Sequence, residues 1–195
     1  MEGSGVIDLD RLYEERKLFG FYAEQLSYPE EENLYPGILD DYLTEDHPSY
    51  DLLLEYLTQI EHKTLYERQT KYTETFDFQK DCTLFMTYVK FEDSKGRGQM
   101  LARLKVLYEM FGLEMPEGEL ADLLPLMCEF VEVAEWKGDP RAQQSFSLLL
   151  AVLEDGSYHL MNALKKYESP YYPLVRGMRE TFKACIVQKE ANAND

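Results

Sequence analysis

The stretch from Tyr72 to Val133 constrains the fold of this chain more than any other part of the sequence. Large apolar side chains recur in it at helical spacing, and strong backbone breaks separate the helical patterns. The polar run 94–98, Ser-Lys-Gly-Arg-Gly, is predicted to be a hinge between two helices. A connector with proline and glycine follows over residues 114–118, and then an acidic and aliphatic run over 120–130. Helices on either side of this stretch are expected to pack around it.

Helix start signals divide the first part of the chain. Asp8 is predicted to cap a helix that runs to about Ser27. Thr64 with Glu67 three residues later matches a capping box, so a new helix is expected from there to about Phe76. Two more helices are expected between these, a short one over residues 36–43 and a longer one over 48–60.

The central patterns predict further helices. Asp81 is expected to cap a helix whose apolar stripe consists of Leu84, Phe85, Tyr88 and Phe91. After the predicted hinge, the clearest helical pattern runs to Phe111, and Gly112 stands where a left-handed C-cap is wanted. Pro125 must either start a helix or kink one, because it cannot donate a backbone hydrogen bond.

The last third of the chain is also helical in pattern. A bend is expected at Asp155-Gly156, and Ser169-Pro170 is predicted to start the last helix. No segment shows the alternation of a strand. We therefore expect one all-α domain over residues 1–189, a bundle of about eight to ten helices, and a polar, frayed tail over 190–195.

The charge of the chain bounds its partners. The formal net charge is −17, with 37 acidic against 20 basic residues. Such a chain lacks the basic footprint that nucleic acid needs, and an anionic membrane surface would repel it. The charge favours a basic or amphipathic peptide as partner. Plain solubility is the alternative explanation.

Three cysteines, Cys82, Cys128 and Cys185, stand far apart in apolar helical patterns. They form no CxxC pair and no zinc spacing, so we interpret them as reduced, buried side chains. The N-terminus is acidic and has no hydrophobic signal core, and no apolar run is long enough to span a bilayer. We expect a cytoplasmic protein without membrane insertion.

Signatures of catalysis are missing from the sequence. It contains no HExxH, no Walker A loop, no GxSxG and no GxGxxG that opens a βαβ unit. The three histidines, His47, His62 and His159, have no paired ligand at helical spacing. We therefore predict no enzyme activity, no metal and no bound cofactor. A carboxylate pair assembled in space is an alternative that the sequence leaves open.

The run 120–130 has the composition of a peptide-binding surface. If it is helical, Leu126, Met127 and Phe130 share one side, and Asp122 and Glu129 flank them. An apolar floor with acidic edges would receive an amphipathic helix that carries basic residues. The alternative is that these apolar side chains fill the core.

The same stretch resembles a known family. The matching pieces stand in order here: Tyr72-x-x-x-Phe76-Asp77, Lys95-Gly96-Arg97-Gly98-Gln99-Met100, Leu107-Tyr108-Glu109 with Gly112-Leu113, and Glu119 to Leu126 ending in Glu129-Phe130. This order is similar to that of the NarJ branch of the TorD/DmsD/NarJ chaperones, which are all-helical proteins. The family usually shows Asp-His-Leu where this chain has Asp122-Leu123-Leu124, so no role of that histidine is carried over.

The resemblance implies a function and a partner. NarJ-type proteins are cytoplasmic chaperones that bind the N-terminal segment of the apo catalytic (alpha) subunit of respiratory nitrate reductase. They hold that client until its molybdenum cofactor is inserted. The alternatives are a permanent all-α subunit or regulator of another redox complex, and an enzyme with a carboxylate site. A monomer or weak homodimer is expected.

The resemblance also implies site residues by motif position. Arg97 and Gly98 are expected to form a hinge that orders the groove. Exchanging either acidic residue of the groove for lysine is predicted to weaken client binding without disturbing the fold. The residues expected to line the client groove are Tyr72, Phe76, Tyr88, Asp122, Pro125, Met127, Glu129 and Phe130.

Overall fold

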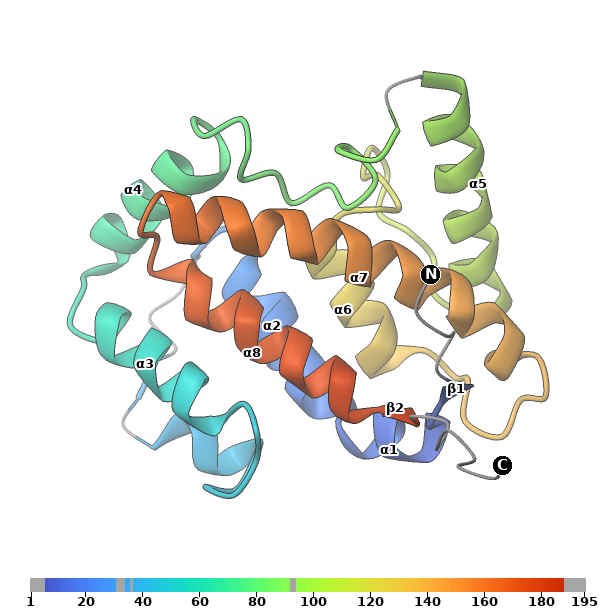
Figure 1. Ribbon diagram of the computed structural model, residues 1–195, viewed down its shortest axis with the longest axis horizontal. Coiled ribbons are helices and arrows are strands. Elements are labelled where there is room, and N and C mark those ends of the chain that lie inside the picture. Colours follow the sequence, from blue (N-terminus) through green and yellow to red (C-terminus); the bar gives the residue numbers. More distant parts are fainter. Residues whose placement is uncertain (1–5, 31–33, 36, 92–93, 188–195) are drawn as a thin grey trace, which may run out of the picture.

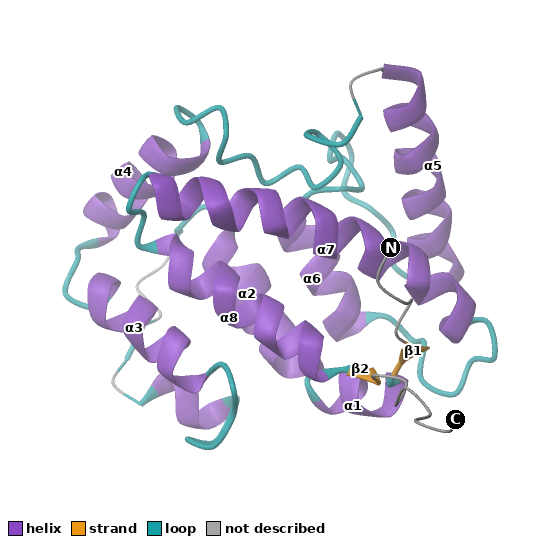
Figure 2. Ribbon diagram, viewed as in Figure 1, coloured by secondary structure: helices purple, strands orange, loops and turns teal. Residues whose placement is uncertain are grey.

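The computed structural model describes residues 6–30, 34–35, 37–91 and 94–187. This part of the chain is a bundle of helices with one two-stranded sheet (Figures 1 and 2), which confirms the predicted all-α class. The frayed tail predicted for 190–195 lies outside the described residues. The elements are β1 (Val6–Ile7), α1 (Leu9–Glu14), α2 (Arg16–Leu26), the 3-10 helix η1 (Ile38–Asp41), α3 (Tyr50–Ile60), α4 (Leu65–Phe76), α5 (Ser94–Met110), α6 (Leu124–Val133), α7 (Ala142–Lys166), α8 (Tyr171–Ala184) and β2 (Ile186–Val187).

The predicted caps start their helices. The Asp8 carboxylate accepts a hydrogen bond from the Arg11 backbone N–H at 3.0 Å and begins α1. Thr64 and Glu67 form a complete capping box at the start of α4: each side chain accepts a hydrogen bond from the other's backbone N–H. The helix expected from Asp8 to about Ser27 is two helices, because the chain leaves α1 at Glu15 before α2 begins.

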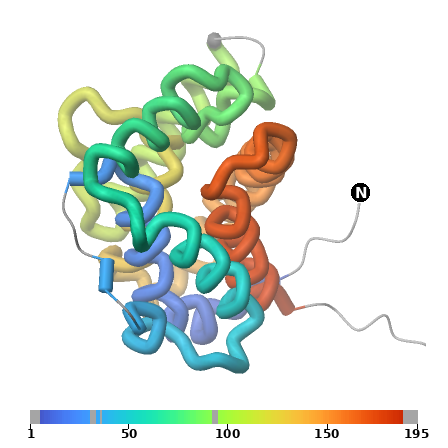
Figure 3. Tube along the Cα trace, turned by 90° about the vertical axis from the view of Figure 1, so that its left-hand side faces the viewer, coloured from blue at the N-terminus to red at the C-terminus, as the bar shows by residue number. Residues whose placement is uncertain are grey.

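The helices form two layers. Helices α7 and α8 run side by side at the front of Figure 1, with α2 and α6 behind them. Figure 3, turned by 90°, shows α7 and α8 on one side and α2 with α6 on the other. Helix α2 packs against α6, and α3 packs against α8. Because the apolar side chains of both layers point toward each other, they enclose one continuous core.

Aromatic rings fill one end of this core. Trp136 and Phe146 lie 4.9 Å apart between ring centroids, and Phe130 with Tyr108 lies at 4.7 Å. All four side chains are fully buried. The rings are tilted against one another, an arrangement that aromatic pairs favour.

A buried polar cluster joins α2, α8 and the residue before α3. Thr181 of α8 shares hydrogen bonds with the Tyr22 hydroxyl of α2 at 2.9 Å and with the Ser49 hydroxyl at 2.8 Å. Ser49, just before α3, also donates to the Gly177 carbonyl at 2.8 Å. Since each of these buried hydroxyls has partners, the cluster fixes the relative positions of the helices without an unsatisfied polar group.

The sheet was not expected from the sequence. β1 pairs with β2 in antiparallel fashion, with Val6 opposite Val187 and Ile7 opposite Ile186. Two residues a strand are too few for alternation to show in the sequence. The pairing brings the beginning and the end of the described chain together (Figure 1).

The helix predicted from Asp81 to Phe91 is wrong. Residues 77–91, called the turn segment below, contain turns and one isolated bridge in place of a helix. Its backbone bonds across the molecule: the Leu124 N–H donates to the Leu84 carbonyl, and the Met86 N–H donates to the Asp122 carbonyl, both at 2.9 Å. Backbone groups engaged in this way cannot form the local bonds of a helix.

Two predicted breaks are also wrong. Residues 94–98 form the beginning of α5 and are not a hinge between helices. The bend expected at Asp155-Gly156 is absent, because α7 is one helix of 25 residues. Gly156 serves a different purpose: a Cβ on it would lie 2.5 Å from the Met86 carbonyl oxygen. The missing side chain therefore lets the turn segment lie directly on α7.

Candidate functional site

The structure separates the predicted groove residues into three places. Tyr72 and Phe76 lie on α4, half-buried, in a group of rings with Tyr171 and Tyr28. Tyr72 is 4.8 Å from Phe76 and 5.5 Å from Tyr28 between ring centroids. Burial raises the pKa of the Tyr72 phenol to about 12. These contacts hold the C-terminal half of α4 against the start of α8.

The residues predicted on α6 lie mostly in the core. Pro125, Met127 and Phe130 are buried, and Glu129 is exposed. Leu126, expected to share the apolar floor, is buried too. The predicted open floor is therefore absent, and the alternative, that these side chains fill the core, is correct. A short helix that is apolar over most of its circumference buries most of its side chains.

Asp122 lies at the centre of a third place. Its side chain is fully buried, and its Oδ2 accepts hydrogen bonds from the Thr87 backbone N–H at 3.0 Å and from the Thr87 hydroxyl. The Arg97 guanidinium donates to the same oxygen at 3.3 Å and to the Thr87 hydroxyl at 3.1 Å. The three residues thus tie the turn segment, the start of α6 and the start of α5 together.

This cluster gives Arg97 a structural role that differs from the predicted hinge. Arg97 stands in the first turns of α5, and its side chain is anchored to a buried carboxylate. Gly98 is exposed, and no atom lies within 4 Å of the place where its Cβ would be. The role of a hinge is therefore not visible at either residue. The ion pair between Arg97 and Asp122 links α5 to the rest of the molecule.

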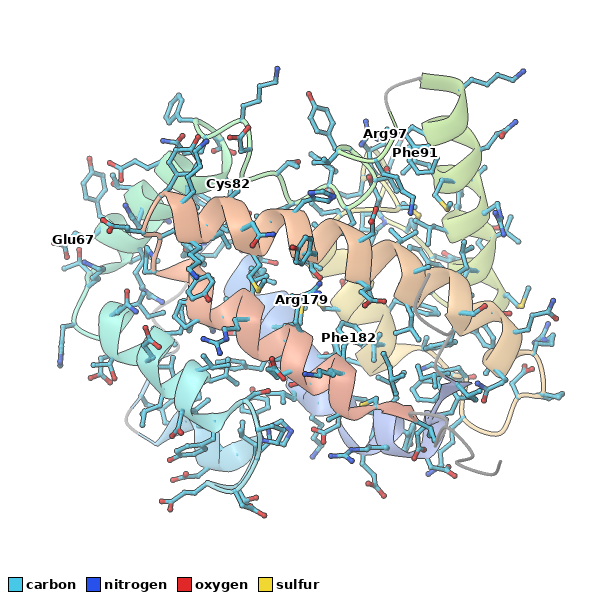
Figure 4. All side chains as sticks on the ribbon, in the orientation of Figure 1. Glu67, Cys82, Phe91, Arg97, Arg179 and Phe182 are labelled. Carbon is cyan, nitrogen blue, oxygen red and sulfur yellow. The ribbon has the colours of Figure 1, made fainter. Side chains whose placement is uncertain are left out.

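A groove lies directly outside this cluster, between the turn segment and α7. Its volume is about 760 Å³. We call it the segment groove; it is lined by Lys80, Asp81, Tyr88, Val89, Phe91, Arg97, His159, Asn162, Ala163 and Lys166. Figure 4 shows Phe91 and Arg97 near each other on this side of α7, close to α5. Of the predicted client-groove residues, Tyr88 lines it.

Apolar surface is open to a partner in the segment groove. Tyr88 is 47% exposed and Val89 is 46% exposed, and the two are adjacent in the lining of this groove. The Arg97 guanidinium lies 5.7 Å from the centre of the Tyr88 ring, within the range of a cation–π contact. The fastened arginine therefore also positions an exposed ring.

The charge of the segment groove is mixed, unlike the acidic edges predicted for a groove on the run 120–130. Lys80, Arg97 and Lys166 bring three cations, against Asp81 at the rim and the buried Asp122 behind it. Lys166 also pairs with Asp81 at 3.1 Å. Since cations and carboxylates nearly balance, apolar contact rather than charge dominates this surface.

Sequence reasoning missed the side of the groove that α7 contributes. His159, Asn162, Ala163 and Lys166 recur at positions i, i+3, i+4 and i+7, so they share one helix face. The signal available was that three of these four residues, His159, Asn162 and Lys166, are polar and share one helix face. Nothing in the sequence showed that the turn segment lies against it.

The described residues hold no group of three His, Cys, Asp or Glu side chains that is suited to a metal ion. None of the helices described here has both the length and the hydropathy required to cross a membrane.

Comparison with known proteins decides the family. Residues 40–176 match the family model described as "Nitrate reductase delta subunit". The matched span contains every residue of the segment groove. The chain belongs to the nitrate reductase delta subunit family. The resemblance to NarJ-type proteins is thereby confirmed.

Individual relatives agree with this family. The chain is 29% identical over 183 residues to the probable nitrate reductase molybdenum cofactor assembly chaperone NarJ of Bacillus subtilis, covering 83% of this chain and 90% of that protein. It is 27% identical over 148 residues to the probable chaperone NarW of Escherichia coli, covering 74% of this chain and 61% of NarW. The nitrate reductase-like protein NarX of Mycobacterium tuberculosis is 27% identical over 157 residues, 80% of this chain. This chain spans only 23% of NarX.

Proposed function

We propose that this chain is an assembly chaperone for a respiratory nitrate reductase. It binds the N-terminal segment of the apo catalytic subunit in the cytoplasm and holds that subunit while the molybdenum cofactor is inserted. The observation that carries the proposal is the family match, which includes the whole segment groove. NarJ of Bacillus subtilis and NarW of Escherichia coli bear the names of such chaperones.

The segment groove is our candidate for the client's binding place. It offers the exposed ring of Tyr88 and the exposed side chain of Val89 beside Arg97, which is paired with Asp122. Apolar contacts of this kind suit the apolar face of an amphipathic segment. Asp122 supports this surface from behind, because its buried carboxylate accepts hydrogen bonds from Thr87 of the turn segment and from Arg97. Met127 and Phe130 are core residues.

The chaperone itself performs no chemistry in this proposal. It needs only to bind the immature client more tightly than the finished enzyme, since a partner shifts an equilibrium only by differential affinity. Insertion of the cofactor and folding of the client would withdraw the N-terminal segment and release the chaperone.

Calorimetric titration with a peptide that copies the N-terminus of a nitrate reductase catalytic subunit tests the proposal. We expect binding with a negative heat-capacity change, because apolar surface is buried. Tyr88→Ala should weaken binding by about tenfold or more, because truncation of an aromatic residue at an interface hot spot costs about 2 kcal/mol or more. Tyr66→Ala is the matched control, since Tyr66 is 77% exposed on α4 and does not line the groove.

The outcomes separate cleanly. Equal binding by the wild type and both variants would place the client elsewhere on the chain. Because cations and carboxylates nearly balance in the segment groove, we expect only a weak effect of salt. Strong weakening by salt would instead point to the acidic surface outside the groove.

A permanent subunit is the second candidate function, and the family's description as a subunit favours it. Purification of the chain with the catalytic subunit before and after cofactor insertion distinguishes the two. A chaperone is lost from the finished enzyme, whereas a permanent subunit stays in stoichiometric amount.

A further inference from the structure

A second groove lies between α7 and α8. Its volume is about 590 Å³. Its α7 residues, from Leu150 to Lys165, occupy a different face of that helix from the segment groove, because successive residues turn by about 100°. Figure 4 shows Arg179 and Phe182 on this side of α7, away from Phe91 and Arg97. We call this surface the α7–α8 groove.

The charge of this groove is opposite to that of the chain. Two carboxylates line it, those of Glu154 and Glu180. Four cations line it as well, which leaves an excess of two positive charges on a chain of net charge −17. These four are Lys165, Arg176, Arg179 and Lys183.

Arg179 links the two helices that form the walls of the groove. Arg179 donates to the Glu154 backbone carbonyl at 2.6 Å and to the Ser157 hydroxyl at 2.7 Å. Its guanidinium therefore fastens α8 to α7. Arg179 is half-buried, and this burial lowers the pKa of its guanidinium from the ordinary value. Half-buried charges interact more strongly than charges in water.

The other cations are available to different degrees. Lys183 is 3.8 Å from the Glu180 carboxylate, a loose pair within one helix turn. Lys165 and Arg176 are both exposed, and within the described ranges neither takes part in an ion pair. These two side chains are therefore the ones that a bound anion would meet.

The floor between the cations is apolar. Leu150, Met161 and Ile186 are half-buried, and Phe182 lies beneath them. Tyr158 is 51% exposed at the edge. The groove thus combines an apolar floor with basic rims, the pattern that an amphipathic helix with acidic flanks would complement.

The length of the groove fits a helix. From Leu150 to Lys165 the α7 wall spans roughly 22 Å, since each helical residue rises about 1.5 Å. We propose that the α7–α8 groove binds an acidic amphipathic helix of a partner protein, with its apolar face on the floor and its carboxylates at Lys165 and Arg176. This surface is separate from the segment groove and does not depend on the function proposed above.

A synthetic peptide of about 16 residues, with Leu on one helical face and Glu flanking it, is the probe. Its binding to the full chain is measured by fluorescence anisotropy at low salt. We expect saturable binding that falls at least tenfold when Gln replaces every Glu of the peptide. Lys165→Glu and Arg176→Glu should each weaken binding about tenfold or more.

Two matched variants control for net charge. Lys17→Glu on α2 and Arg103→Glu on α5 change exposed residues outside the groove by the same amount of charge. Circular dichroism of all four variants should match the wild type. If the controls weaken binding as much as the groove variants, or if the peptide does not bind at all, the proposal fails.

Competition by inorganic phosphate distinguishes a small-anion site from a helix-binding site. Displacement of the peptide by phosphate at low millimolar concentration, with no effect of removing Leu from the peptide, would show a small-anion site and overturn the proposal. Loss of binding when Ala replaces each Leu supports the helix as occupant.

Discussion

The two sides of α7 are built in different ways. On one side lies α8, a regular helix that meets α7 through side chains along its length. On the other side lies the turn segment, whose backbone touches α7 at Gly156 and bonds to residues 122–124. Helices share their contacts among many side chains, whereas the turn segment depends on a few specific ones. The turn segment, which depends on fewer contacts than α8, is also the one that forms the segment groove with α7.

This difference predicts unequal sensitivity to mutation, and the largest effect is expected at Gly156. A Cβ there would meet the Met86 backbone, which cannot move aside as a flexible side chain can. Gly156→Ala should lower the free energy of unfolding by about 1–3 kcal/mol, as measured by urea denaturation. Gly98→Ala is the control: its Cβ meets open space, so it should raise stability by about 0.4–1 kcal/mol. A neutral Gly156→Ala would show that the two backbones are not tightly packed.

An effect of similar size is expected at Asp122. Asp122→Ala removes the acceptor of the Thr87 N–H and of the Arg97 guanidinium, which should cost about 1–3 kcal/mol of unfolding free energy. Asp122→Lys, which the sequence suggested would leave the fold intact, should unfold at least the turn segment because the site is fully buried. Glu129→Ala, at an exposed position of α6, should stay within about 0.5 kcal/mol. Equal losses at both positions would remove the distinction between buried and exposed carboxylates.

The reactivity of buried thiols compares the local opening of the turn segment with that of α6. Cys82 lies in the turn segment and Cys128 in α6, and both are buried. Burial raises the pKa of the Cys82 thiol to about 11 and that of Cys128 still further. We compare two variants in which Cys82 or Cys128 is the single remaining cysteine. Ellman's reagent should modify Cys82 at least about tenfold faster than Cys128, a difference of about 1.4 kcal/mol in opening free energy. The reason is that the turn segment opens locally, whereas α6 opens only with the core. Similar rates would mean that the two regions open together.

The smallest effect is expected at the surface pair that joins the turn segment to α7. Lys90 and Asp155 lie 3.3 Å apart, and both are well exposed to solvent. Asp155→Asn should cost at most about 0.5–1 kcal/mol, since solvent screens such pairs. The loss should disappear in about 1 M salt. An effect as large as that of Gly156→Ala would show that charge, rather than backbone contact, holds the segment.

Local signals in the sequence were read correctly where neighbouring residues decide the structure. The Thr64–Glu67 capping box and the Asp8 cap need only partners three residues away. Gly112 has a positive φ of 85°, as its place after the α5 pattern suggested. The last helix begins after Ser169-Pro170, as predicted.

Distance along the chain explains where the predictions failed. The stripe from Leu84 to Phe91 has helical spacing, but its backbone bonds to residues more than thirty positions away. Gly156 looked like a bend because a glycine in a helix usually weakens it. Its actual reason is a contact with Met86, seventy positions earlier.

The sequence by itself determined the helical class, most helix boundaries and the family of this protein. These follow from periodicity, caps and motif order, all of which are local properties. Only the tertiary structure decided which apolar residues are core, that Asp122 is buried against Thr87 and Arg97, and that two grooves flank α7. The physical reason is that burial and ion pairing depend on partners from distant parts of the chain, which the order of residues does not bring together on its own.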